Sequence, residues 1–216
     1  MVDRTADLAA GAAPGAGGGT GRFSRHGAAT LPATAPTRRS WTALAPSCRV
    51  TTSGRWRPAY VALGSNLDDP EARVGEAFGR LHDLEGCRMV CRSRRWRSTP
   101  LGPVEQPPFV NAVAGLLTVL SPRDMLAALK DIERAMGRQQ PVLHWGPRRI
   151  DLDLLVVGSE QLAEPELVLP HPGLPARDFV LYPLLELAPE LWVPGFGRVK
   201  DLAAGVNDRG LVALGE

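Results

Sequence analysis

The sequence lacks several features that would point to common classes of protein. No stretch approaches the roughly 18 consecutive apolar residues that a membrane-spanning helix needs, so no membrane association is expected. The three cysteines, Cys48, Cys87 and Cys91, are odd in number and have no zinc-type partners nearby. A reducing compartment fits best, so we expect a cytoplasmic protein in which Cys87 and Cys91 are packing residues.

Two glycine-rich phosphate-binding patterns are also missing. The sequence contains neither G-x-x-x-x-G-K-[ST] nor G-x-G-x-x-G. The single glycine of ALGSN, Gly64, is interpreted as a turn residue and indicates little by itself. A bound nucleotide would therefore have to be held by arginines and a metal ion rather than by a phosphate-cradling loop.

Acidic residues are absent from Leu8 to Arg57, and charge is unevenly spread along the chain. Residues 1–57 hold eight arginines and two aspartates, a charge of +6; because the whole chain carries +2, the remainder carries −4. The basic balance is thus no indication that the folded part binds nucleic acid.

Ala, Gly and Pro dominate residues 1–57, and such a composition buries too little apolar surface to offset the entropy of ordering. We expect a disordered extension there. A misplaced start codon and an organelle transit peptide are alternatives. Residues 58–216 are expected to form one folded domain.

The apolar pattern after residue 58 alternates between periods typical of strands and of helices. Strands are expected at 59–65, 87–98, 109–120 and 150–157, and helices after Asp69 and after Ser121. In the second strand, alternation would place Cys87, Met89 and Cys91, with Ser93, on one face. The order β-α-β-β-α-β predicts an α+β, ferredoxin-like antiparallel sheet with both helices on one face. A C-terminal extension follows, with a helix near 178–187.

The last of these strands contains two aspartates, Asp151 and Asp153, which alternation places on the same face. Two carboxylates this close repel each other, and burying them unpaired is costly. A bound divalent cation removes the conflict, and hard oxygen ligands suit Mg²⁺. The alternative is a solvated pair neutralised by Arg148 and Arg149.

Cationic side chains gather in the Gly- and Pro-rich loops, where sites are usually built. They are Arg138, His144, Arg148, His171 and Arg177, and arginines beside an acidic pair fit a metal-bound polyphosphate. Plainer interpretations stay open: Arg138 could complement the dipole of the preceding helix, and His171 could be a turn residue.

The segment from Ser98 to Asn111 carries groups that suit a flat heterocycle. Phe109 offers a stacking surface, while the Asn111 amide and the hydroxyls of Ser98 and Thr99 are directional hydrogen-bonding groups. A turn followed by one core phenylalanine would have the same pattern.

Five blocks occur in order with short gaps: ALGSNL, STPLGPVEQPPFVNA, IERAMGR, HWGPRRIDLDLL and LPHPGLPARDFVLYPLLELAPEL. Together, over about residues 59–195, they resemble the 6-hydroxymethyl-7,8-dihydropterin pyrophosphokinase family of folate biosynthesis. The WGPR-x-x-DLD block followed by the PH…R-x-F block is the most specific part of the resemblance.

The resemblance implies transfer of the β,γ-diphosphate of ATP to the hydroxymethyl group of the pterin, with release of AMP. It implies two Mg²⁺ ions on Asp151 and Asp153, with Arg138 and Arg148 assisting the transfer. The implied ATP-site positions are Glu133, Arg138, Trp145, Arg148, His171 and Arg177. The implied pterin-pocket positions are Ser98, Thr99, Leu101, Phe109, Asn111 and Phe179. ATP and the pterin would be the only partners of a monomer that binds no nucleic acid.

Five positions depart from the pattern of the family. Thr is common where Ser98 stands and Tyr is frequent where Phe109 stands; basic residues are frequent at Gln140 and His144; and Pro172 replaces a frequent aromatic or polar residue. These departures bear on ATP affinity and loop closure rather than on the reaction. Two other classes remain: an RNA-binding module on the same kind of sheet, and a different metal-dependent phosphoryl or nucleotidyl transferase.

Overall fold

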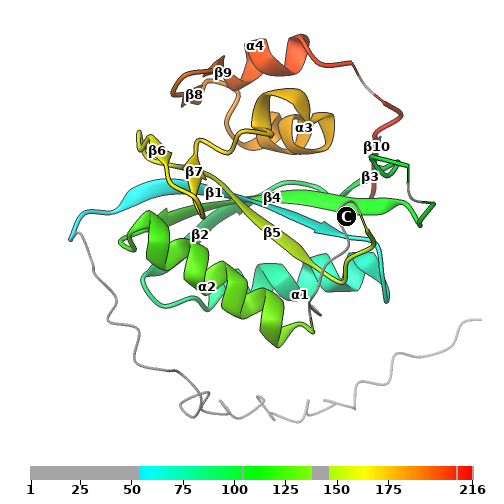
Figure 1. The fold of residues 1–216 in the computed structure, drawn as a ribbon, viewed down its shortest axis with the longest axis horizontal. Helices are drawn as coiled ribbons and strands as arrows, with labels where there is room; N and C mark the ends of the chain where they lie inside the picture. Colours follow the sequence, from blue (N-terminus) through cyan, green and yellow to red (C-terminus); the bar gives the residue numbers. More distant parts are fainter. Residues whose placement is uncertain (1–53, 104, 138–145, 208, 216) are drawn as a thin grey trace, which may run out of the picture. The chain divides into compact units, whose positions relative to one another are not determined.

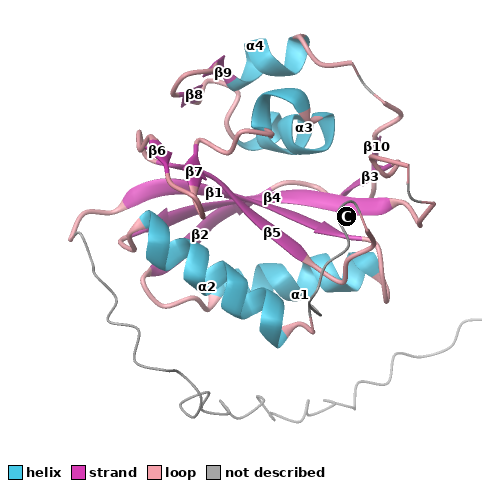
Figure 2. Ribbon diagram, in the orientation of Figure 1, coloured by secondary structure: helices cyan, strands magenta, loops and turns pink. Residues whose placement is uncertain are grey.

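The structure, a computed structural model, describes residues 54–103, 105–137, 146–207 and 209–215. The elements, drawn in Figures 1 and 2, are β1 (Arg57–Ser65), α1 (Pro70–His82), β2 (Cys87–Arg92), β3 (Trp96–Ser98), β4 (Phe109–Thr118), α2 (Pro122–Ala135), β5 (Asp151–Val157), β6 (Leu162–Ala163), β7 (Val168–Leu169), a 3-10 turn (Leu174–Ala176), α3 (Asp178–Leu187), β8 (Trp192–Val193), β9 (Gly197–Arg198), α4 (Val199–Ala204) and β10 (Val212–Ala213).

The main sheet is antiparallel throughout. Its strands lie in the order β5–β1–β4–β3–β10, and β2 pairs with the other end of β4. The antiparallel sheet and the six predicted elements are therefore confirmed, except that the strand expected at 87–98 is divided into β2 and β3. β1 begins at Arg57, whose guanidinium forms an ion pair with Glu160 at 2.5 Å, so this residue is part of the sheet.

The two helix starts expected from the sequence are capped as their residues suggest. The Asp69 carboxylate accepts a hydrogen bond from the Ala72 N–H at the start of α1. The Ser121 hydroxyl accepts from the Asp124 N–H and donates to the Asp124 carboxylate at the start of α2. Gly137, with φ of +84°, follows the last turn of α2, where the left-handed conformation favours glycine.

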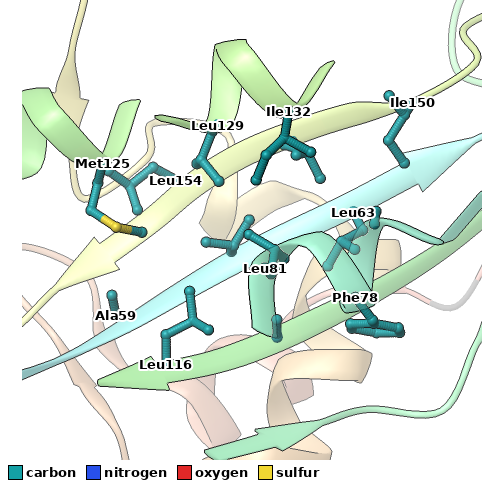
Figure 3. Packing of buried hydrophobic residues seen from close by; sticks show 14 of the residues in the cluster. Ala59, Leu63, Phe78, Leu81, Leu116, Met125, Leu129, Ile132, Ile150 and Leu154 are labelled. Carbon is teal, nitrogen blue, oxygen red and sulfur yellow. The ribbon is translucent and has the colours of Figure 1, made fainter. Parts of the chain in front are cut away.

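One face of the sheet packs against α1 and α2 and forms the larger core (Figure 3). Leu81 and Leu129 reach it from the helices, and Leu63, Leu152 and Leu154 reach it from the central and edge strands. Each of these side chains is at most 5% exposed, and burying a leucine stabilises the fold by about 1.5–3 kcal/mol. The prediction that α1 and α2 share a face is confirmed.

The opposite face packs against α3 (Figure 1). Leu181 and Leu184 of α3 meet Val113 of β4 and Leu155 of β5 in a second, smaller core. This helix covers only part of the face, and the uncovered part holds the pocket described below.

The prediction that Cys87, Met89 and Cys91 share one face is wrong for Cys91. A bulge between Met89 and Cys91 shifts the register of β2 against β4, so that Met89 lies opposite Leu116 and Cys91 lies opposite Gly115. The Cys91 thiol occupies the space where a side chain at Gly115 would lie, on the α3 face. The Ser93 hydroxyl accepts a hydrogen bond from the Val113 N–H, so this side chain takes part in the pairing with β4. Cys87 and Cys91 thus cannot act as a pair of metal ligands.

Candidate active site

A pocket opens on the α3 face, where the ends of the central strands meet the first turn of α3. Its floor follows a row of side-by-side positions across the sheet: Asp151 of β5 pairs with Gly64 of β1, which pairs with Asn111 of β4. Two inter-strand spacings place the backbones of Asp151 and Asn111 roughly 10 Å apart. An acidic end and an amide end are therefore separated by the width of a small ring system.

The acidic end is formed by the two aspartates of β5. Asp151 and Asp153 both line the pocket, while Leu152 and Leu154 point into the core on the other face. The predicted common orientation of the two carboxylates is confirmed. Arg148 forms an ion pair with Asp151, and Arg177 lies 3.5 Å from Asp153.

Burial raises the pKa of the Asp153 carboxyl, and the negative charge of Asp151 raises it further. The positive charges of Arg177 and Arg148 oppose this shift without cancelling it. A metal cation bound between the two carboxylates would remove their repulsion. The alternative of a solvated pair neutralised by Arg148 and Arg149 fails for Arg149, which pairs with Asp68 at 2.7 Å instead.

Glu133 of α2 fixes the backbone between the two aspartates. It is 5% exposed, and its carboxylate accepts a hydrogen bond of 2.7 Å from the N–H of Leu152. Because β5 is an edge strand, an N–H that points away from β1 has no strand partner. Glu133 supplies that partner. It does not line the pocket, so the structure gives it this anchoring contact in addition to the predicted role at an ATP site.

The amide end of the pocket is built by a hydrogen bond between two buried side chains. The Asn111 Nδ2 donates to the Ser98 hydroxyl at 2.8 Å, which leaves the Asn111 Oδ1 over Gly64. A Cβ at Gly64 would lie 3.3 Å from that oxygen. The interpretation of Gly64 as a turn residue is wrong, because Gly64 belongs to β1 and is part of the pocket floor.

Two aromatic rings, Phe109 and Phe179, line the pocket from different elements. Phe109 begins β4, and Phe179 follows the first residue of α3. The guanidinium of Arg177 lies 5.9 Å from the centre of the Phe179 ring. Apolar rings beside directional polar groups are typical of a site for a planar heterocycle.

Asn66 is a buried residue beside the site that was not predicted from the sequence. It is 2% exposed, its Oδ1 accepts from the Arg148 N–H at 2.7 Å, and its Nδ2 donates to Gln106 and to the Pro107 carbonyl. One amide thus joins the loop before β5 to the loop before β4. A lone Asn after a strand has no distinctive sequence pattern, which is why it was overlooked.

The structure brings together most of the predicted site residues. The pocket is lined by Ser98, Thr99, Leu101, Phe109, Asn111, Arg148, Asp151, Asp153, Arg177 and Phe179. His171 lies beside it, with its Nε2 3.9 Å from Asp153. Arg138, Gln140, His144 and Trp145 lie outside the described residues. Ala62, Leu63, Gly64, Gln106, Gly146 and Val180 are lining residues that were not predicted.

The imidazole of His171 is oriented by its own turn. Its Nδ1 accepts from the Gly173 N–H at 3.0 Å, so the neutral ring carries its proton on Nε2, on the side of Asp153. Burial lowers the pKa of His171, and the nearby Asp153 partly offsets this shift. A neutral imidazole beside the acidic pair can donate a hydrogen bond without adding a charge.

The described residues contain no group of three or more His, Cys, Asp or Glu side chains that could hold a metal ion by themselves. Two carboxylates that face a pocket suit a cation such as Mg²⁺, which completes its coordination with water and substrate oxygens. The donor set of Asp151 and Asp153 therefore fits a metal that arrives with a phosphorylated ligand.

An antiparallel α/β protein with an acidic pair, flanking arginines and an aromatic pocket belongs to the class of proteins that act on a nucleotide and a heterocycle. The family model that matches residues 60–189 is 7,8-dihydro-6-hydroxymethylpterin-pyrophosphokinase. The chain belongs to this family.

Curated relatives support the same assignment. The 2-amino-4-hydroxy-6-hydroxymethyldihydropteridine pyrophosphokinase of Pseudomonas aeruginosa is 45% identical over 155 residues, which are 72% of this chain and 95% of the relative. The enzyme of the same name from Haemophilus influenzae is 38% identical over 156 residues, which are 72% of this chain and 97% of the relative.

A solved structure shares the fold at low sequence identity. Wild-type Plasmodium falciparum HPPK-DHPS matches with a TM-score of 0.55 at 15% identity, over 70% of this chain and 41% of the other. At that identity the likeness supports the mixed α/β fold alone.

Proposed function

We propose that this chain carries out the reaction for which its family is named. It transfers a diphosphate group from ATP to the hydroxymethyl group of 6-hydroxymethyl-7,8-dihydropterin, with release of AMP, in folate biosynthesis. The proposal rests on the row of paired positions from Asp151 through Gly64 to Asn111. This row places carboxylates that suit metal-bound phosphates at one end of the pocket and an amide that can hydrogen-bond to a heterocycle at the other.

Asp151 and Asp153 hold two Mg²⁺ ions together with the phosphates of ATP. When bound, the metal supplies positive charge that offsets the charge of the transferring group. Arg148 and Arg177 lie within ion-pair distance of the two carboxylates, so both guanidinium groups would be near phosphate oxygens held at this end of the pocket. Glu133 keeps the two aspartates in register by holding Leu152 between them.

The pterin binds at the opposite end of the pocket. Phe109 and Phe179 stack on the ring, and Thr99 and Leu101 line the adjacent wall. The Ser98 hydroxyl accepts a hydrogen bond from the Asn111 Nδ2. The Asn111 Oδ1 is therefore left as an acceptor for an N–H at the edge of the pterin ring. This arrangement would direct the hydroxymethyl group toward the acidic end, where the phosphorus atom that it attacks is held.

Trp145 and Arg138 complete the ATP site in this proposal, the arginine next to the transferring phosphates, although both lie outside the described residues. His171 contributes from beside Asp153. The fold is a ferredoxin-like βαββαβ unit with a C-terminal extension, supported by the strand order β5–β1–β4–β2 with α1 and α2 on one face. Residues 58–216, together with Arg57 at the start of β1, are the catalytic domain of a cytoplasmic monomer, and the residues before Arg57 are an extension to it. No helix in the described part of the chain is long and apolar enough to cross a membrane.

A coupled assay of AMP release tests the proposal directly. The full chain should form AMP only when ATP, Mg²⁺ and 6-hydroxymethyl-7,8-dihydropterin are all present. The matched control is 6-methyl-7,8-dihydropterin, which has the ring but no hydroxyl acceptor. AMP formation that does not depend on the hydroxymethyl group would refute the proposal.

Metal binding has a readout that is independent of turnover. With an unreactive ATP analogue and the pterin, Mg²⁺ should raise the thermal midpoint of the wild-type chain, because ligands that bind only the folded state stabilise it. The Asp151→Asn variant should lose this Mg²⁺-dependent rise. A rise that survives the substitution would place the metal elsewhere.

The alternative of an RNA-binding module is not supported. Such a sheet needs exposed aromatic side chains on its central strands. Here α1 and α2 cover one face of β1 and β4, and α3 covers part of the other, where Tyr60 packs against the second core and Phe109 lines the pocket.

A further inference from the structure

A buried carboxylate at the start of α3 joins the C-terminal segment to the pocket wall. Asp178 is 3% exposed, and its Oδ1 accepts a hydrogen bond of 2.9 Å from the Phe179 N–H. Its Oδ2 accepts one of 3.1 Å from the N–H of Arg209, 31 residues further along the chain. Within the described part of the chain, Asp178 takes part in no ion pair, so both oxygens are committed to backbone groups.

The same C-terminal segment is attached to β3 by three further contacts. Strand β10 pairs with β3 (Figure 1), and the Leu214 N–H donates to the Arg95 carbonyl at 2.8 Å. The Thr99 hydroxyl reaches the carbonyl of Arg209 at 3.5 Å. Residues 209–214, which we name the C-terminal clasp, thus bind both the end of β3 and the beginning of α3.

The end of β3 and the beginning of α3 contain the residues that form the pterin side of the pocket in the proposed function. Ser98 ends β3 and Thr99 follows it, and Phe179 follows Asp178 in α3. β3 has only three residues and would otherwise be paired with β4 alone. The clasp therefore adds a second connection between two pocket-lining segments, which also contact each other through the Trp96 and Tyr182 rings, 6.1 Å apart. It also lies beyond residues 60–189, the part that the family model matches.

We propose that Asp178 is a positioning residue for pterin binding, acting through Phe179 and through the clasp. It does not line the pocket. The two N–H donors approach different oxygens of the carboxylate, and an amide in its place would set an NH2 donor against one of them. The inference rests on the proposed function, in which this wall contacts the pterin, and it predicts a loss of pterin affinity without a matching loss of ATP affinity.

A pair of substitutions at Arg209 tests the link while leaving Asp178 intact. Arg209→Pro removes the N–H that Asp178 accepts, whereas Arg209→Ala keeps it. In the full chain, Arg209→Pro should raise the KM for the pterin roughly tenfold, equivalent to about 1.4 kcal/mol, with the KM for ATP within twofold of wild type. Arg209→Ala should match wild type in both constants.

A wild-type pterin KM in Arg209→Pro, or an equal rise in both KM values, would overturn the inference. So would the same rise in Arg209→Ala. The proposed function would survive any of these results, because it fails only if the wild-type chain forms no pterin-dependent AMP.

A second pair of variants addresses the carboxylate itself. Asp178→Asn should show the same selective rise in the pterin KM. The matched control is Asp201→Asn, which changes an exposed aspartate in the first turn of α4 and should leave both KM values unchanged. If Asp178→Asn fails to fold, the Arg209 pair still decides the question. A folded Asp178→Asn with wild-type constants would contradict the inference.

Discussion

The two faces of the main sheet are built from the same strands but serve different purposes. Under α1 and α2 the face is closed by apolar side chains, among them Leu152 and Leu154. Under α3 it is closed only in part, and the same strand β5 presents Asp151 and Asp153 to the open pocket. Because neighbouring residues of one strand belong to different faces, stability and turnover should respond to different residues of β5.

The largest effect on turnover is expected from the pocket face. Asp153→Asn should lower kcat by roughly three orders of magnitude, about 4 kcal/mol of transition-state stabilisation, because one of two metal-binding carboxylates is lost. The pKa of Asp153 is raised in the folded protein, so near neutral pH its ionised form opposes folding, and a neutral amide removes that cost.

The thermal midpoint of Asp153→Asn should accordingly stay at or above the wild-type value. Calorimetry and AMP release on one preparation provide both measurements. If the midpoint collapsed along with kcat, the acidic pair would be structural, and the comparison between the two faces would fail.

The neighbouring residue on the core face should show the opposite behaviour. Leu154→Ala should lower the free energy of unfolding by about 2–5 kcal/mol, because a buried leucine leaves a cavity behind. The kcat per folded molecule should stay near wild type at a temperature well below the unfolding transition. Urea unfolding and initial rates test this, and a kcat that falls as far as in Asp153→Asn would show that the two faces are not independent.

An intermediate effect is expected at the pocket floor. In Gly64→Ala the new methyl group would lie 3.3 Å from the Asn111 Oδ1 and would occupy space below the pterin. The KM for the pterin should rise roughly tenfold, the lower end of what one misplaced methylene costs in a fitted pocket. The control is Gly79→Ala in α1, where no atom lies within 4 Å of the added Cβ and both KM values should be unchanged. Equal kinetics for the two variants would remove Gly64 from the site.

The smallest effect on the kinetic constants is expected from removing the residues before Gly54. A chain that begins at Gly54 keeps the ion pair of Arg57 with Glu160, and its kcat and both KM values should lie within twofold of the full chain. Parallel assays of the two proteins are sufficient. A large loss of activity in a folded product would give the N-terminal extension a role in the site.

The local rules of sequence predicted much of this architecture. Period-2 alternation placed Asp151 and Asp153 on one face, and the caps at Asp69 and Ser121 predicted where α1 and α2 begin, because these features depend on residues close together in the chain. A helix was also expected near 178–187, and α3 spans Asp178–Leu187.

Features set by distant contacts were not predictable in the same way. The bulge in β2 lies opposite Gly115 in β4, where the absence of a side chain leaves space for Cys91. Asn66 and Asp178 join segments far apart in the chain, and neither belongs to a pattern that marks it in advance. Site residues were predictable where the side-chain type itself indicates the chemistry, as with paired carboxylates. They were not predictable where a residue only positions another residue.

Because of the bulge in β2, one cysteine of this strand lies on each side of the main sheet. Cys87 lies against the layer formed with α1 and α2, and Cys91 against the layer formed with α3. Both thiols are partly buried, and burial raises their pKa, so each should react slowly in the folded protein and faster when the layer beside it opens. In a Cys48→Ser background, timed alkylation followed by mass spectrometry would therefore record the opening of the two layers separately within a single molecule.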